Sequence, residues 1–93
     1  MRLRFYIDRE TDGPHIHRHA VSEEEVEEVL AHPLEDRPGA EGSRVTIGQT
    51  RGGRYLRVIY VPDPEPASLF VITAYELEPK ALRALRRRRR RRR

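Results

Sequence analysis

The chain contains no cysteine, which excludes disulfide bonds and thiolate chemistry. No apolar run approaches the roughly 20 residues of a membrane-spanning helix, and the first residues lack the apolar core of a signal peptide. A length of 93 residues is enough for one small domain but not for a deep substrate cavity. We therefore expect a cytoplasmic protein with no membrane partner.

The positive charge is concentrated at one end of the chain. The formal net charge is +4, and removing the eight consecutive arginines 86–93 leaves −4 for residues 1–85. The sequence therefore predicts a single domain over 1–85 and a poly-arginine tail over 86–93, which is disordered or a partly helical extension of the last helix. We expect this tail to contact nucleic acid through phosphates. The alternatives are docking on an acidic partner segment, or no role.

Apolar and β-branched residues predict four strands, at 2–8, 44–50, 54–62 and 69–76. The second and third flank Arg51-Gly52-Gly53, which is typical of a hairpin. Turn and loop residues occupy the segments 11–14, 36–43 and 62–66.

Three helical segments complete the pattern. Residues 15–20 predict a short helix, and Ser22 with Glu25 forms a capping box that starts a longer helix ending at Pro33. A last helix is expected to begin near Pro79. The predicted order is strand, helix, helix, three antiparallel strands, helix, which is an α+β fold of two layers.

Alternation along the hairpin and the last strand predicts two different sheet faces. The expected core face holds Val45, Ile47, Leu56, Val58, Tyr60, Phe70 and Ile72. The expected opposite face holds Arg44, Thr46, Thr50, Tyr55, Arg57, Thr73 and Tyr75. Arginines and aromatic rings suit an RNA backbone and stacked bases, although an ordinary solvated face is the alternative.

Three histidines in close succession, His15, His17 and His19, raise the question of a metal site. In a strand all three would share a face, whereas in a helix only His15 and His19 would pair. A stable site usually needs more ligands and supporting partners, and no HExxH pattern is present. We therefore predict no metal, with the histidines on a helix surface.

Two motifs and a strand follow one another along the chain. The first motif is His19-Ala20-Val21-Ser22-Glu23-Glu24-Glu25. The second runs from Arg44 to Val58 and includes Gly48, Thr50, Gly53, Arg54 and Leu56. The strand is Ile72-Thr73-Ala74. In order and spacing they resemble the BrnT-like branch of the RelE/ParE toxin superfamily. The resemblance implies a RelE-like fold, in which an antiparallel sheet packs against helices.

The same resemblance implies a function. It implies the toxin of a bacterial type II toxin–antitoxin pair, an endoribonuclease that inhibits translation by cutting RNA, free or on the ribosome, without a cofactor. The implied partner is a cognate antitoxin protein. The matching residues are His19, Arg44 and Arg54. Phe70 and Tyr75 stand where family members often carry arginine, and Arg57 is a local addition.

RNA cleavage requires a group that takes the 2′-OH proton, a group that stabilises the phosphate, and a group that protonates the leaving oxygen. We assign proton transfer to His19 and Tyr75, and phosphate stabilisation to Arg44 and Arg54. The expected RNA-binding residues are Arg44, Arg54, Tyr55 and Arg57. His19 could instead be a packing residue. The whole chain could instead be a non-catalytic nucleic-acid-binding module, or a toxin relic that binds only its partner.

Overall fold

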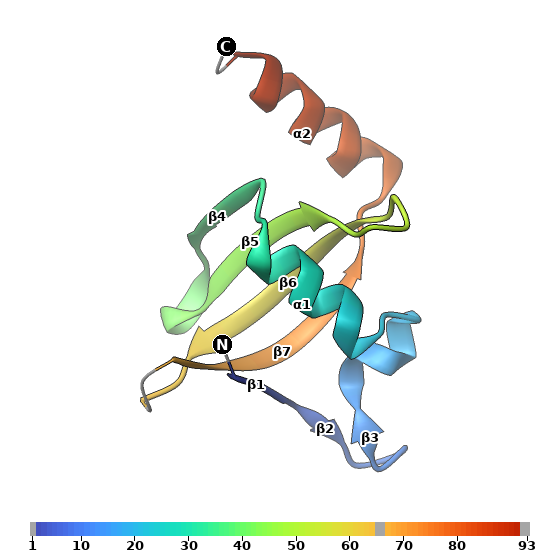
Figure 1. Ribbon diagram of the computed structural model, residues 1–93, viewed down its shortest axis with the longest axis vertical. Coiled ribbons are helices and arrows are strands. Elements are labelled where there is room, and N and C mark those ends of the chain that lie inside the picture. Colours follow the sequence, from blue (N-terminus) through green and yellow to red (C-terminus); the bar gives the residue numbers. More distant parts are fainter. Residues whose placement is uncertain (1, 65–66, 92–93) are drawn as a thin grey trace.

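A five-stranded sheet forms the body of the protein in the computed structural model, which describes residues 2–64 and 67–91 (Figure 1). The strand order is β1-β7-β6-β5-β4. The bounds are β1 Arg2–Phe5, β4 Glu35–Pro38, β5 Arg44–Gln49, β6 Tyr55–Pro62 and β7 Ser68–Glu76. β1 runs parallel to β7, and the other neighbours are antiparallel. The α+β class is confirmed, whereas the expected purely antiparallel sheet is wrong, because the first strand joins the edge beside the last.

The first expected strand is divided in two. β1 ends at Phe5, and β2 (Ile7–Asp8) pairs with β3 (Gly13–Pro14) in a separate two-stranded sheet. Tyr6 joins the two sheets, since its N–H donates to Val71 O at 2.9 Å and its carbonyl accepts from His15 N at 2.8 Å. The expected element order therefore lacked β2 and β3.

The segment 36–43 is also more structured than expected. β4 (Glu35–Pro38) lies at the sheet edge, where a proline removes no ladder hydrogen bond. A 3-10 turn, η2 (Ala40–Gly42), leads into β5. The other expected loop, 62–66, is described only as far as Pro64, since residues 65 and 66 lie outside the described part of the chain.

The capping box is present as predicted. A 3-10 helix, η1 (His15–His19), is followed by α1 (Glu23–Ala31). The N–H of Glu25 donates to Ser22 Oγ at 3.1 Å, and the N–H of Ser22 donates to Glu25 Oε1 at 3.0 Å. Two otherwise unpaired donors at the helix start are thereby satisfied.

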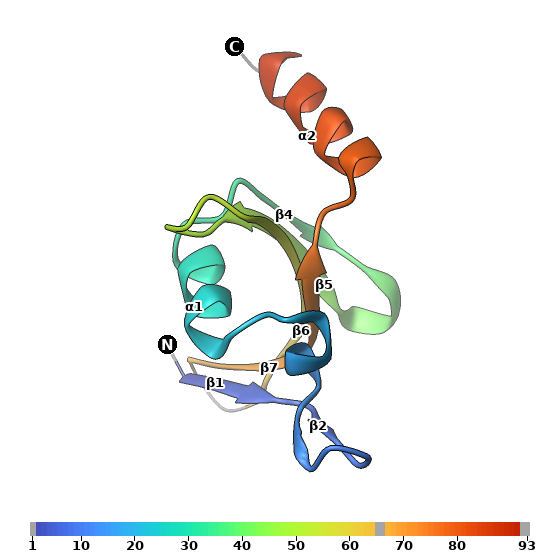
Figure 2. The ribbon, with the colours of Figure 1, turned by 90° about the vertical axis from the view of Figure 1, so that its right-hand side faces the viewer.

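The main core lies between α1 and one face of the sheet, which curves round the helix (Figure 2). Val26 and Val29 of α1 are fully buried with Leu56, Val58 and Val71 of the sheet. Gly48 permits the close approach of the helix, because a Cβ atom there would lie only 3.0 Å from Val29 Cγ1.

The expected faces of β5 are reversed. Thr46 lies opposite Val58 and Gly48 lies opposite Leu56, so Arg44, Thr46 and Gly48 face α1. Val45 and Ile47 therefore lie on the other face. Both faces of β5 are covered, since Ile47 packs with Leu77 and Leu85, and alternation cannot identify the core face of such a strand.

A β-bulge shifts the faces of β7 as well. The register changes between Ile59 and Tyr60, so Tyr60 lies opposite Val71. Val71 is fully buried in the core, whereas Phe70, the expected core residue, is only partly buried and stacks with Arg4 on the other face. Because the bulge inserts one residue in β7, Val71 faces the core in the place expected for Phe70.

The last helix, α2 (Pro79–Arg91), begins at the predicted proline and includes the described part of the arginine tail. Both ribbon views show it projecting from the body (Figures 1 and 2). The helical form of the tail is therefore the one observed through Arg91, and Arg92 and Arg93 lie outside the described residues. No helix in 2–64 or 67–91 has the length and apolar character needed to cross a membrane.

Replacing Ser22 with alanine should destabilise the protein by about 1 kcal/mol, because the N–H of Glu25 loses its acceptor. Thermal melts of the two proteins measure this difference. Ser22→Asp is the matched control, since aspartate also accepts a hydrogen bond at this position. Equal melting temperatures for the alanine variant and the parent would contradict the capping role.

Candidate functional site

His19 and Tyr75 meet at one edge of the sheet. η1 ends at Ala20, whose left-handed backbone (φ 56°) turns the chain and leaves His19 exposed. The His19 ring lies edge-on to the Tyr75 ring of β7, with 5.9 Å between ring centres. The structure therefore brings together the two side chains that were predicted to transfer protons during RNA cleavage.

Arg57 completes this cluster from the neighbouring strand. It lies opposite Tyr75, and its guanidinium carbon is 5.9 Å from the centre of the Tyr75 ring. The Arg57 Nε atom is buried without a hydrogen-bond partner, and no ion pair to Arg57 is found within 2–64 and 67–91. No ion pair therefore neutralises the Arg57 charge within these ranges.

These three side chains border a shallow depression of about 460 Å³. Ala81 of α2 and residues 76–78, which connect β7 to α2, form the rest of its wall, so the carboxylates of Glu76 and Glu78 also border it. Tyr55, two residues before Arg57 on β6, lies on the same sheet face and receives the Arg86 guanidinium at 5.9 Å from its ring centre. We call Tyr55, Arg57, Tyr75 and His19 the aromatic strip.

A second histidine supports the strip. The His15 ring lies edge-on to His19, with 5.3 Å between ring centres, and its Nδ1 is 3.2 Å from Asp8 Oδ2. A carboxylate can only accept, so His15 Nδ1 carries the proton in this contact. The N–H of Glu10 and the His15 ring lower the pKa of Asp8, which keeps the carboxylate ionised. The pairing of His15 with His19 is the one expected for a helix, whereas the contact of His15 with Asp8 was not expected from the sequence.

Arg54 has a different environment from the one expected. Its NH1 group donates to Ala20 O at 2.9 Å and to both Glu25 carboxylate oxygens at 3.0 Å. Its Nε donates to Glu76 at 3.3 Å. Through NH1 and Nε the guanidinium therefore joins the residue after η1 to α1 and to the end of β7. This geometry makes Arg54 a positioning residue.

Arg44 does not belong to the depression. It faces the α1 side of the sheet, the side opposite to Arg57, and its Nε lies 2.9 Å from Asp36 Oδ1. The Tyr60 hydroxyl donates to the other Asp36 oxygen at 3.1 Å. The hydrogen bond to Asp36 raises the pKa of Arg44 further above its usual range. Of the predicted residues, the structure thus unites His19, Tyr75, Arg57 and Tyr55, but not Arg44.

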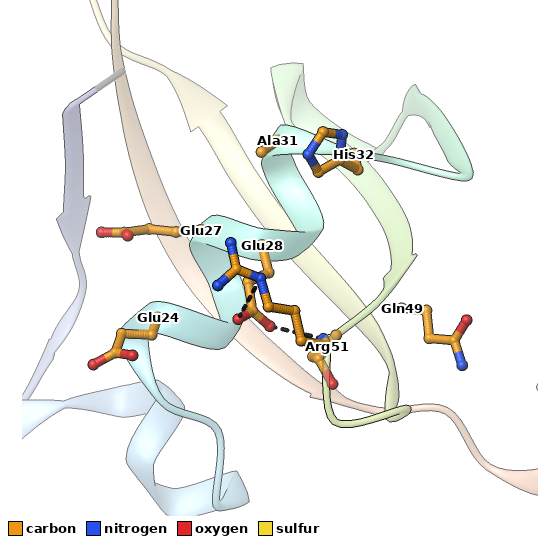
Figure 3. A pocket seen from close by; sticks show the side chains of 8 residues that line it. Glu24, Glu27, Glu28, Ala31, His32, Gln49 and Arg51 are labelled. Carbon is orange, nitrogen blue, oxygen red and sulfur yellow. Dashed lines mark hydrogen bonds and ion pairs between the residues drawn. The ribbon is translucent and has the colours of Figure 1, made fainter.

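A second hollow, of about 430 Å³, lies between α1 and the hairpin turn (Figure 3). Glu28 accepts from the N–H of Arg51 at 3.0 Å and also pairs with its guanidinium at 3.7 Å. Figure 3 shows the Glu24 and Glu27 side chains extending away from this contact. Three carboxylates border this hollow against one paired arginine, so its surface is acidic.

Comparison with known proteins gives one match. A family model described as "Domain of unknown function (DUF4258)" matches residues 15–76, which include η1, α1, β4, β5, β6 and β7. No curated protein and no solved structure matches the chain. His19, Arg57 and Tyr75 all lie inside the matched segment, whereas α2 lies outside it.

Replacing Glu25 with glutamine should lower the free energy of unfolding at pH 7 by about 1 to 2 kcal/mol, because Arg54 loses a charged acceptor. The Ser22 N–H and Arg54 hold the pKa of Glu25 below its ordinary 4.5. This stabilisation is therefore present above about pH 4.5 and is lost as the pH falls through the lower folded-state pKa.

Urea unfolding of both proteins from pH 7 downward tests the expectation that the difference disappears in acid. Glu24→Gln is the matched control, since it removes the same charge from the same helix turn. A pH-independent difference, or an equal loss in the control, would show that the ion pair does not stabilise the fold.

Proposed function

We propose that this chain, which belongs to the DUF4258 family, is an RNA-cleaving toxin of a bacterial type II toxin–antitoxin pair. In this proposal the fold is RelE-like, the protein acts in the cytoplasm, and a cognate antitoxin restrains it. The observation that carries the proposal is the meeting of His19, Tyr75 and Arg57 at one depression. The three side chains supply the three roles that RNA cleavage requires.

The reaction is an attack of the RNA 2′-oxygen on the adjacent phosphorus. The bond from phosphorus to O5′ breaks, which gives a 2′,3′-cyclic phosphate and a 5′-hydroxyl. His19 takes the 2′-OH proton, since histidine exchanges protons near neutral pH. Tyr75 donates its phenol proton to O5′.

Arg57 stabilises the charge that develops in this reaction. Its guanidinium has no acidic partner among the described residues and lies over the Tyr75 ring. Guanidinium N–H groups match phosphate oxygens in geometry and stay charged at any working pH. Asp8 and His15 stand behind His19 and limit the movement of its ring.

A second candidate function is a non-catalytic RNA-binding module. It is favoured because Arg54 and Arg44 are both occupied by carboxylates, which leaves one free guanidinium at the depression. Incubation of the purified protein with RNA separates the two functions. New 2′,3′-cyclic phosphate ends support the toxin proposal, and a gel shift without new ends supports the module. A toxin relic would show neither.

His19→Gln should lower the cleavage rate by about 100-fold or more while RNA affinity stays unchanged, because only proton transfer is lost. Single-turnover cleavage and filter binding measure the two quantities. His17→Gln is the matched control, since His17 is an exposed histidine of the same turn that does not border the depression. Equal rates for the parent and the His19 variant would remove His19 from the mechanism.

Arg57→Ala should weaken both RNA binding and cleavage, whereas Arg44→Ala should leave both near the parent level. The reason is position, because Arg57 borders the depression and Arg44 is paired with Asp36 on the opposite face. Arg57→Lys should recover only part of the loss, because an ammonium cannot make the bidentate phosphate contact. Circular dichroism confirms folding of each variant. A larger loss in the Arg44 variant would contradict the proposed site.

A further inference from the structure

The arginines of α2 have two different environments. Arg88 makes a two-pronged contact with Glu35 of β4, with both nitrogen–oxygen distances at 2.8 Å. Arg89 donates to Leu34 O at 3.2 Å. These two side chains hold the projecting helix against the edge of the sheet, so their role is structural.

Arg83, Arg87 and Arg90 lie along the outer side of the helix. Their spacing of four and three residues places them on one face, and seven residues of helix extend about 10 Å. All three are exposed, and none forms an ion pair within the described ranges. Together with Arg86 they enclose a hollow of about 320 Å³ that no carboxylate borders.

Four like charges around one hollow repel each other unless an anion lies between them. Arg86 is also the residue that lies over Tyr55 at the end of the aromatic strip. The hollow and the strip are therefore adjacent surfaces that share one side chain. Phosphates suit the arginines and unsaturated rings suit the strip, so a ligand that carries both has the chemistry to bind the two surfaces together.

We propose that the outer arginines of α2, Arg83, Arg87 and Arg90, hold the phosphate backbone of single-stranded RNA whose bases stack along the aromatic strip. This inference deepens the proposed function, because it names the strand that enters the depression and the surface that guides it. An acidic protein segment would satisfy the arginines but would bring no bases to stack on the rings of the strip. A strand that ran past α1 instead of α2 would meet the acidic hollow between α1 and the hairpin turn, whose carboxylates repel phosphate.

The test is a binding experiment with a 2′-O-methyl oligouridylate, which is single-stranded and cannot be cut by 2′-oxygen attack. Affinity is measured across a salt series for the full chain and for the Arg83→Gln, Arg87→Gln, Arg90→Gln triple variant. Each phosphate neutralised on a single strand contributes about −0.7 to the slope of log K against log salt. Loss of three contacts should therefore flatten the slope by about 2 units.

The matched control is the triple variant Arg2→Gln, Arg9→Gln, Arg37→Gln. It removes the same charge from three exposed arginines that border neither the depression nor the hollow. Its slope should change by less than about 1 unit. Glutamine is a good helix former, and circular dichroism verifies that α2 remains folded.

Three results would overturn the inference. The first is an unchanged slope in the α2 variant. The second is equal flattening in both triple variants, which would indicate general charge attraction. The third is binding of polyglutamate as tightly as the oligouridylate, which would identify an acidic protein segment as the ligand.

The two proposals can fail separately. If natural RNA stays uncut while the α2 variant flattens the slope, the nuclease proposal fails and the RNA-binding surface stands. If RNA is cut and the slope is unchanged, the surface fails and the nuclease proposal stands.

Discussion

The geometry of the depression depends on the Glu25 carboxylate and its contact with Arg54. Glu25 accepts from the N–H of Ser22, the residue before α1, and from Arg54, which also binds Ala20 O and Glu76. The end of η1, the start of α1 and the end of β7 therefore meet at one guanidinium. His19 precedes Ala20 and Tyr75 precedes Glu76, so the same contact sets the separation of His19 and Tyr75. A helix cap thus becomes part of the framework of the site.

Local signals in the sequence were sufficient to predict where helices begin, but they did not predict which face of a strand lies against the core. Ser22 and Glu25 interact three residues apart, and Pro79 starts its helix by its own geometry, so both were predictable. The face of β5 depends on α2, which begins thirty positions after the strand ends and buries Ile47. The role of Arg54 likewise depends on carboxylates 29 and 22 residues away in sequence. A sequence shows which residues are charged, but it does not show which residue pairs with each charge in the fold.

Three residues of the candidate site, Tyr55, Arg57 and Tyr75, were expected on one sheet face and lie on one face in the structure. His19, Tyr75 and Arg57 each stood out by type and position, yet only the pairing of β6 with β7 places Arg57 opposite Tyr75. The Asp8–His15 contact was not predictable, because the break after Phe5 that turns β2 away from the main sheet leaves no clear mark on the alternation of residues 2–8.

The negative charge of the body and the positive charge of α2 lie in different parts of the molecule. Residues 1–85 carry a net charge of −4, and the positive charge lies on a helix that projects from the body. A polyanion is therefore repelled by the acidic side of α1 and attracted to α2, which gives its approach a direction. Arg88 and Arg89 fix that helix to the body, while Arg86 faces both the outer hollow and Tyr55. Because Ala81 at the helix base also borders the depression, the cationic helix and the depression are adjoining surfaces.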